Sequence, residues 1–122
     1  MILADANVWI DFFRSRDPEL RKLLENREVA MHPCVAAELS LGSLCDRSAT
    51  LAQLDAMPQA RVADLREIRQ MIEVRPLHAK GIGLTDAHLA ASCLITPGTR
   101  LWTRDARLRS VAQSLGIDAG LP

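Results

Sequence analysis

The first nine residues constrain the fold most, because a short apolar run there ends abruptly in a carboxylate. Residues 2–4 are too few for a helix, and their apolar character predicts a short buried strand. Asp5 would then lie at the carboxyl end of that strand. In open parallel α/β sheets, ligands bind in the crevice beyond the strand tips. Asp5 is therefore the first candidate site residue.

The rest of the chain alternates between predicted helices and short strands. Further strands are predicted over residues 28–32 and 99–103, with an edge strand over 117–119. Pro18 fits the first position of a helix, and Thr85 fits the N-cap of another. Helices are predicted over 8–14, from 18 to about 24, and over 34–44, 47–57, 64–74, 85–94 and 105–115. This alternation predicts one α/β domain over residues 1–122, with a mostly parallel sheet covered on both faces.

Composition excludes several classes of protein. The chain is 48% hydrophobic and 25% charged, which is typical of soluble globular domains. Its 15 basic and 15 acidic residues balance, which argues against a broad basic surface that coats nucleic acid. A local basic patch is still possible, because four arginines lie close together in sequence. Alternatively, these arginines are simply solvated side chains at a strand end and on a helix. These are Arg100, Arg104, Arg107 and Arg109.

The three cysteines do not have the spacing of a disulfide framework or of a zinc site. Cys34, Cys45 and Cys93 each lie in an apolar helical context, so each is predicted to be a small buried thiol. The N-terminus has no positive region of the kind found in signal peptides, and no apolar run is long enough to span a membrane. We therefore expect a soluble, cytoplasmic protein.

Three further acids each have both a structural and a functional interpretation. Glu38 shares a helical stripe with apolar residues, where a carboxylate is costly unless it is paired or bound to a cation. It could instead reach solvent or an arginine at the edge of that face. Asp86 lies near a helix start and could complement the helix dipole. Asp105 opens a helix and could serve only as its N-cap.

The acids are more informative together. Asp5 and Asp105 each follow a predicted strand, so both belong at the same edge of the sheet, and Asp86 begins a helix that is expected at that edge. Clustered carboxylates repel and raise one another's pKa, which favours a divalent cation among them. Oxygen-only ligands suit Mg²⁺ or Mn²⁺ rather than zinc. Such sites activate water in phosphoryl transfer.

The chain resembles the PIN-domain ribonucleases and, within them, the VapC toxins of bacterial toxin–antitoxin pairs. Four segments in the family's order carry the resemblance: 3–9, 35–39, 83–91 and 101–105. The resemblance implies a three-layer α/β/α fold with a central, mostly parallel sheet. It also implies roles for six residues: Asp5, Glu38, Asp86 and Asp105 as catalytic ligands of Mg²⁺ or Mn²⁺, with Asn7 and Thr103 as hydrogen-bonding supports.

The resemblance also implies a reaction and partners. The reaction is hydrolysis of an RNA phosphodiester by metal-activated water, giving 5′-phosphate and 3′-hydroxyl ends. The partners are a second copy of the chain and a VapB-type antitoxin, as a homodimer or a hetero-oligomer in the bacterial cytoplasm. Arg100, Arg104 and Arg107 are candidate RNA contacts. Some family members carry a further acid where Arg107 and Arg109 stand here, so the number of bound metal ions stays open.

Other functions fit the sequence less well. A phosphatase with an aspartyl nucleophile needs a second acid at the position of Asn7, and a phosphoacceptor receiver domain needs a lysine at a late strand end. His88 lies on a helical face with Ser92 and is predicted to be a satisfied helix residue rather than a ligand. The alternative from another class is a catalytically silent PIN scaffold that binds RNA or protein, although silent members tend to lose acids and this chain has all four.

Overall fold

A three-stranded parallel sheet lies at the centre of the computed structural model, which describes all residues 1–122. The strands are β1 (Ile2–Ala4), β2 (Val29–Ala30) and β3 (Arg100–Trp102), in the order β2-β1-β3. The central strand β1 pairs with β2 from Ile2 and with β3 up to Ala4, which lies opposite Trp102. The carboxyl ends of β1 and β3 therefore lie side by side, as predicted for the two strands that precede Asp5 and Asp105.

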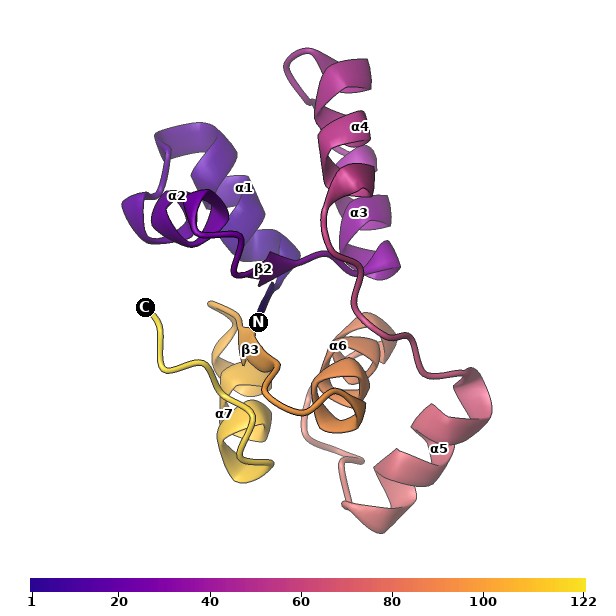
Figure 1. Cartoon of the computed structure of the whole chain (residues 1–122). Coiled ribbons are helices and arrows are strands. Elements are labelled where there is room, and N and C mark those ends of the chain that lie inside the picture. The colour runs from indigo at the N-terminus through magenta and orange to yellow at the C-terminus, as the bar shows by residue number, and fades with distance from the viewer.

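Seven helices cover the sheet on both faces, which confirms the three-layer α/β/α arrangement. In Figure 1, α1 and α2 lie to the left of the strands and α5 and α6 to the right. The helices are α1 (Ala6–Ser15), α2 (Pro18–Glu25), α3 (Pro33–Ser40), α4 (Arg47–Ala56), α5 (Leu65–Val74), α6 (Leu84–Ile95) and α7 (Ala106–Ser114). No helix is long and apolar enough to cross a membrane.

Local sequence explains where several helices begin. The carboxylate of Asp17 accepts the N–H groups of Glu19 and Leu20, and Pro18 occupies the first turn of α2, where a missing N–H costs nothing. At α5, Asp64 and Glu67 form a reciprocal capping box. These starts are the ones that the sequence predicts most directly.

The core is mostly aliphatic, with Trp9 and Trp102 among its buried residues, and it extends over both faces of the sheet. Its 19-residue cluster draws Leu3 and Leu101 from the strands, Leu20 from α2, Val35 from α3 and Leu89 from α6. A smaller cluster lies between α5 and α6. β1 is buried on both faces of the sheet. A polar group at its end is therefore shielded from water and needs hydrogen-bonding or ionic partners within the protein.

Several predicted boundaries are wrong. Helix α3 ends at Ser40 instead of residue 44, so Leu41 is 88% exposed and Cys45 lies exposed in a turn rather than buried in a helix. Helix α6 begins at Leu84 with Gly83 as its N-cap, so Thr85 is inside the first turn and does not cap it. Residues 117–119 contribute only an isolated bridge to β3 rather than an edge strand.

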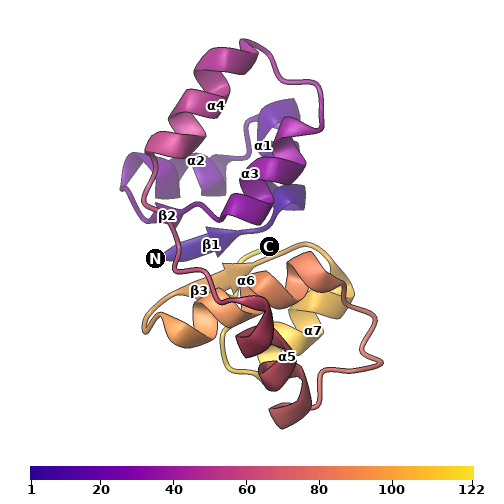
Figure 2. The ribbon, with the colours of Figure 1, turned by 90° about the vertical axis from the view of Figure 1, so that its right-hand side faces the viewer.

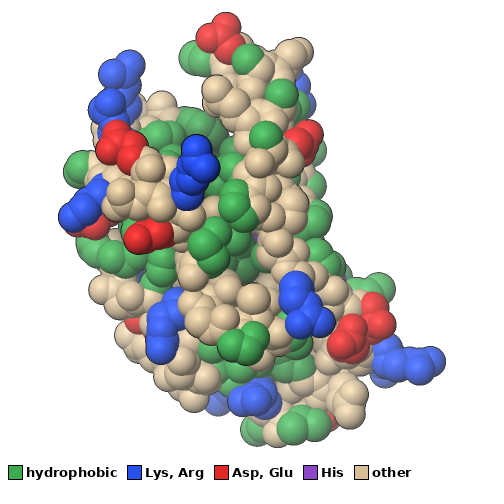
Figure 3. All heavy atoms as spheres, in the orientation of Figure 1, with side chains coloured by type: hydrophobic (Ala, Val, Ile, Leu, Met, Phe, Trp, Pro, Cys, Tyr) green, Lys and Arg blue, Asp and Glu red, His purple; other side chains and the backbone are tan.

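The surface mixes both signs of charge. Figure 3 shows Lys and Arg side chains interspersed with Asp and Glu over the visible face, with apolar side chains between them. This agrees with the zero formal net charge of the chain. Any binding of nucleic acid therefore depends on a local arrangement of groups.

Candidate functional site

Two of the four predicted acids occupy equivalent positions after neighbouring strands. Asp5 follows β1 and caps α1: its Oδ1 accepts the N–H of Ala6 at 2.7 Å, and the residue is 6% exposed. Asp105 follows β3 and caps α7, where its Oδ1 accepts the N–H of Leu108 at 2.9 Å. The parallel pairing of β1 with β3 brings both carboxylates to one edge of the sheet. The capping role suggested by the sequence for Asp105 is real, and it also fixes the direction of the side chain.

A buried hydrogen-bond network holds Asp5 in place. The Thr103 hydroxyl, 1% exposed, donates to Asp5 Oδ2 at 2.8 Å and accepts the N–H of Asp105 at 3.1 Å. The Asn7 amide donates to Asp5 Oδ2 and to Thr103 Oγ1, each at 3.3 Å, and its carbonyl accepts the N–H of Arg104 at 3.1 Å. Asn7 and Thr103 therefore connect the end of β1 to the end of β3.

The other two acids come from helices that approach the end of β1 from opposite sides. In Figure 2, α3 lies above the tip of β1 and α6 below it. Asp86 is in the first turn of α6, and its Oδ2 accepts the N–H of Gly83 at 3.1 Å. Glu38 is near the end of α3 and is exposed. Burial raises the pKa of Glu38, and the Thr85 side chain partly opposes that shift; the sequence instead predicts Thr85 as a helix cap.

Electrostatics show that these acids act on one another. Burial raises the pKa of Asp5 above its usual range; Thr103 and the Ala6 N–H oppose this shift, while Asp86 and Asp105 add to it. Desolvation of its carboxyl group likewise raises the pKa of Glu38, with further contributions from Asp5 and Asp86. The four acids are therefore close enough to interact, as the sequence predicts.

No basic side chain compensates this negative charge. The ion pairs of the molecule are Arg21 with Glu25 and Arg104 with Asp11 and Asp17, and none includes a site acid. The carboxylates also stay apart, because no three of them bring oxygens within 4.8 Å of one another. The donor set, all oxygen and carrying excess negative charge, fits a hard divalent cation such as Mg²⁺ or Mn²⁺.

The arginines near β3 are largely engaged within the protein, which departs from the predicted RNA-contacting patch. The Arg104 guanidinium binds Asp11 at 2.6 Å and also binds Asp17, and it lies over the Trp102 ring at 5.3 Å. Arg100 donates to the carbonyl of Gly116. Arg107 has no hydrogen-bond partner and is exposed, with its side chain against Gly81. Of the three predicted contacts, Arg104 is engaged by two carboxylates, Arg100 is exposed with one hydrogen bond, and Arg107 is exposed with none.

A second cluster of ligand-type side chains lies beside the acids. His32 caps α3, because its Nδ1 accepts the N–H of Cys34 at 2.9 Å. Burial, with His88 nearby, lowers the pKa of His32 to about 4. His88 is not the satisfied helix residue that the sequence predicts, since its buried Nδ1 has no partner. Sequence analysis missed this cluster because His88 is far along the chain from His32; the only local signal is a histidine directly before a helix-starting proline.

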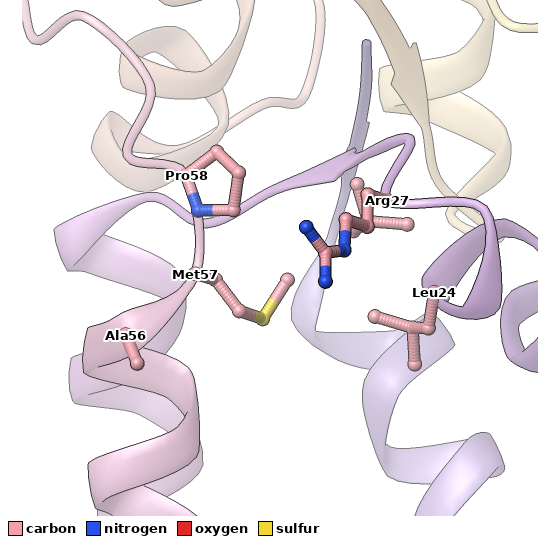
Figure 4. A pocket seen from close by; sticks show the side chains of 6 residues that line it. Leu24, Arg27, Ala56, Met57 and Pro58 are labelled. Carbon is pink, nitrogen blue, oxygen red and sulfur yellow. The ribbon is translucent and has the colours of Figure 1, made fainter.

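An apolar pocket lies elsewhere, between α2 and α4. Figure 4 shows the side chains of Leu24, Arg27 and Met57 around it. Ala56, Pro58 and Val29 complete its lining, and no site acid contributes. The leucine stripes of α2 and α4 mostly pack into the core, where Leu20 and Leu54 are buried. The pocket therefore suits an apolar side chain from a protein partner better than a phosphate.

Comparisons with known proteins agree with this geometry. The PIN domain family matches residues 2–114, which include all four acids. Ribonuclease VapC32 of Mycobacterium tuberculosis, from the strains CDC 1551 / Oshkosh and ATCC 25618 / H37Rv, is 38% identical to this chain over 117 residues. The match covers 96% of this chain and 94% of the relative. The chain therefore belongs to the PIN-domain family and, within it, to the VapC-type members.

Proposed function

We propose that this chain is a divalent-metal-dependent endoribonuclease that acts as the toxin of a toxin–antitoxin pair. The observation that carries the proposal is the gathering of Asp5, Glu38, Asp86 and Asp105 at one sheet edge without a counter-cation. Burying or clustering carboxylates in this way is unfavourable unless a cation completes the site. The name of the similar M. tuberculosis protein, a ribonuclease, supports RNA as the substrate.

The four acids would hold Mg²⁺ or Mn²⁺, and the chain's other polar residues would position them. A bound divalent ion supplies Lewis-acid chemistry, activating water and stabilising charge on the phosphate. Thr103 and Asn7 restrain the Asp5 carboxylate, and the caps of α6 and α7 restrain Asp86 and Asp105. Arg107, exposed beside the Gly81 loop, is our candidate for contact with an RNA phosphate.

The alternative, a silent scaffold that binds RNA or protein, is supported only by the looseness of the carboxylate cluster. A scaffold has no need to keep four mutually repelling acids. An assay with total cellular RNA separates the two functions. We expect discrete fragments with Mg²⁺, none with EDTA, and none from the Asp86→Asn protein. Asp55→Asn, the same change at an exposed acid of α4, is the matched control and should cleave normally.

Two outcomes would contradict the nuclease proposal. Well-folded, partner-free protein that cleaves nothing would favour the scaffold. Fragments that persist with EDTA and with Asp86→Asn would come from another nuclease in the sample. Sequencing the fragment ends would then identify the RNA target in the successful case.

We further propose that a VapB-type antitoxin and a second copy of the chain cover its exposed apolar surface. The pocket between α2 and α4 is apolar except for Arg27, and Met57 points into it. Ile10 and Phe13 of α1 are also large apolar side chains left 40% exposed. Exposed apolar pockets and side chains are features of protein interaction sites. Complex formation in the bacterial cytoplasm would then restrain the nuclease until the antitoxin is lost.

A further inference from the structure

His32, Cys34 and His88 converge although they come from different parts of the chain. His32 and Cys34 lie at the start of α3, and His88 lies in α6. One donor atom from each lies within 4.8 Å of the other two, and these are the only three metal-binding side chains in the molecule that come so close. The two imidazole ring centres are 5.9 Å apart. This cluster shares no side chain with the proposed nuclease site, although it lies beside it: burial raises the pKa of the Cys34 thiol, and Glu38 adds to that shift.

Both histidines carry a buried ring nitrogen without a partner. His32 is fully buried; its Nδ1 accepts the Cys34 N–H, and its Nε2 is unpaired. The Nδ1 of His88 is also buried and unpaired. Buried polar atoms in folded proteins are nearly always satisfied, so two unpaired nitrogens in one cluster point to a missing ligand. If these two positions served only to fill the core, apolar side chains would be favoured over histidines.

We propose that His32, Cys34 and His88 form a binding site for a zinc ion. Two imidazole nitrogens and one thiolate are borderline and soft donors, which select Zn²⁺ over Mg²⁺. In a tetrahedral site the ligand atoms are roughly 3.5 Å apart, given metal–ligand bonds of about 2.0–2.3 Å. The donor atoms here lie within 4.8 Å of one another, so binding would draw them closer together. The fourth coordination position is left for water or another ligand.

Binding requires that protons leave the donors. The Cys34 thiol gives up its proton to become a thiolate, which a bound zinc ion makes favourable. At His32 the single proton of the neutral ring leaves Nε2, which then binds the ion, and Nδ1 takes up a proton instead, so Nδ1 no longer accepts the Cys34 N–H. That N–H is one of the free donors of the first helical turn, where water can satisfy it. His88 accepts the ion through the lone pair of its unpaired Nδ1.

The ion would connect the two helices that carry Glu38 and Asp86. Glu38 is one helical turn beyond Cys34 in α3, and Asp86 is two residues before His88 in α6. A zinc ion joining α3 to α6 would fix their separation and stabilise the fold. This inference does not depend on nuclease activity, since it concerns ligands that the carboxylate site does not use.

Cobalt substitution tests the proposal, because Co²⁺ bound to a thiolate absorbs in the near ultraviolet. The titration uses full-length protein carrying Cys45→Ala, which removes the exposed thiol, in excess Mg²⁺ to occupy the carboxylates. We expect a thiolate–cobalt band that Zn²⁺ displaces stoichiometrically. The band should be lost in Cys34→Ala, and the affinity should fall at least about tenfold in His88→Ala. Zn²⁺ should raise the melting temperature of the Cys45→Ala protein and not that of the Cys34→Ala variant.

The matched control separates this site from the nuclease site. Asp86→Asn should keep the cobalt band, and its loss in that variant would assign the ion to the carboxylates and overturn the proposal. A band that survives in Cys34→Ala would also overturn it, because another thiol would then bind the ion. If the Cys45→Ala protein gives no band, the three side chains do not bind the ion and the proposal is wrong.

Discussion

Replacing Thr103 with valine tests the hydrogen-bond network beneath the proposed site. Valine keeps the shape of threonine and removes only the hydroxyl, which donates to Asp5 and accepts from the Asp105 N–H and the Asn7 amide. A hydrogen bond to a charged group contributes roughly 1.5–3 kcal/mol, and a neutral one about 1 kcal/mol. We therefore expect a loss of about 2–4 kcal/mol in the free energy of unfolding. For a domain of this size that lowers the melting temperature by on the order of 10 °C.

The loss should depend on pH with a definite sign. The Thr103 hydroxyl lowers the pKa of Asp5, although burial keeps that pKa above its usual range. Without the hydroxyl, the folded protein holds the ionised carboxylate less well. The destabilisation by Thr103→Val should therefore be largest at neutral pH and shrink as the pH falls through the folded-state pKa of Asp5. Urea unfolding at several pH values, in EDTA, measures it.

The matched control is Thr99→Val, the same change at another buried threonine. Its hydroxyl makes no side-chain hydrogen bond, so we expect a change within about 1 kcal/mol and no pH dependence. Equal destabilisation by the two variants would show that the network around Asp5 contributes nothing special. A pH-independent loss in Thr103→Val would refute the argument that the hydroxyl stabilises the charged form.

Arg104→Ala should destabilise the protein by about 1–3 kcal/mol, because Arg104 forms partly buried ion pairs with Asp11 and Asp17. Desolvation alone would raise the pKa of Asp17, but the contacts with Arg104 outweigh it and lower that pKa. Arg21→Ala, which breaks an exposed ion pair with Glu25, should cost less than about 1 kcal/mol. Equal losses of stability in Arg21→Ala and Arg104→Ala, measured by thermal unfolding, would contradict this reasoning. Met57→Glu should weaken copurification with the cognate antitoxin, because it places a charge in the apolar pocket between α2 and α4, while leaving RNA cleavage by the free protein unchanged. Unaltered copurification would place the antitoxin elsewhere.

The ends of β1 and β3, and the acids that follow them, can be predicted from the sequence because their signals are local. An apolar run followed by Asp5, and another followed by Asp105, sets two strand tips and two helix caps within a few residues each. The parallel sheet then follows from the alternation of strands and helices. Predicting the acidic site therefore requires the topology of the sheet but no knowledge of contacts between distant side chains.

The parts that sequence analysis missed depend on contacts between distant residues. The pairing of His32 with His88 and the binding of Arg104 to Asp17 leave no pattern in either local segment. The end of α3 was misplaced for a different reason: Leu41 looks like a core residue by periodicity, yet nothing packs over it. The cap of α6 was misassigned because Thr85 is the better capping residue by type, while Gly83 has the required backbone conformation.

The position of β1 between two later strands has a consequence for the order in which the protein is completed. The second residue of the chain already belongs to the central strand, but one of its two neighbours begins only at Arg100. During synthesis, Asp5 leaves the ribosome long before Thr103 and Asp105 exist. Every residue before Thr103 is made while the carboxylate at position 5 still lacks the hydroxyl that restrains it. The proposed acidic site therefore cannot be assembled until β3 and Asp105 have been made, which leaves the intervening synthesis as time for a partner to bind first.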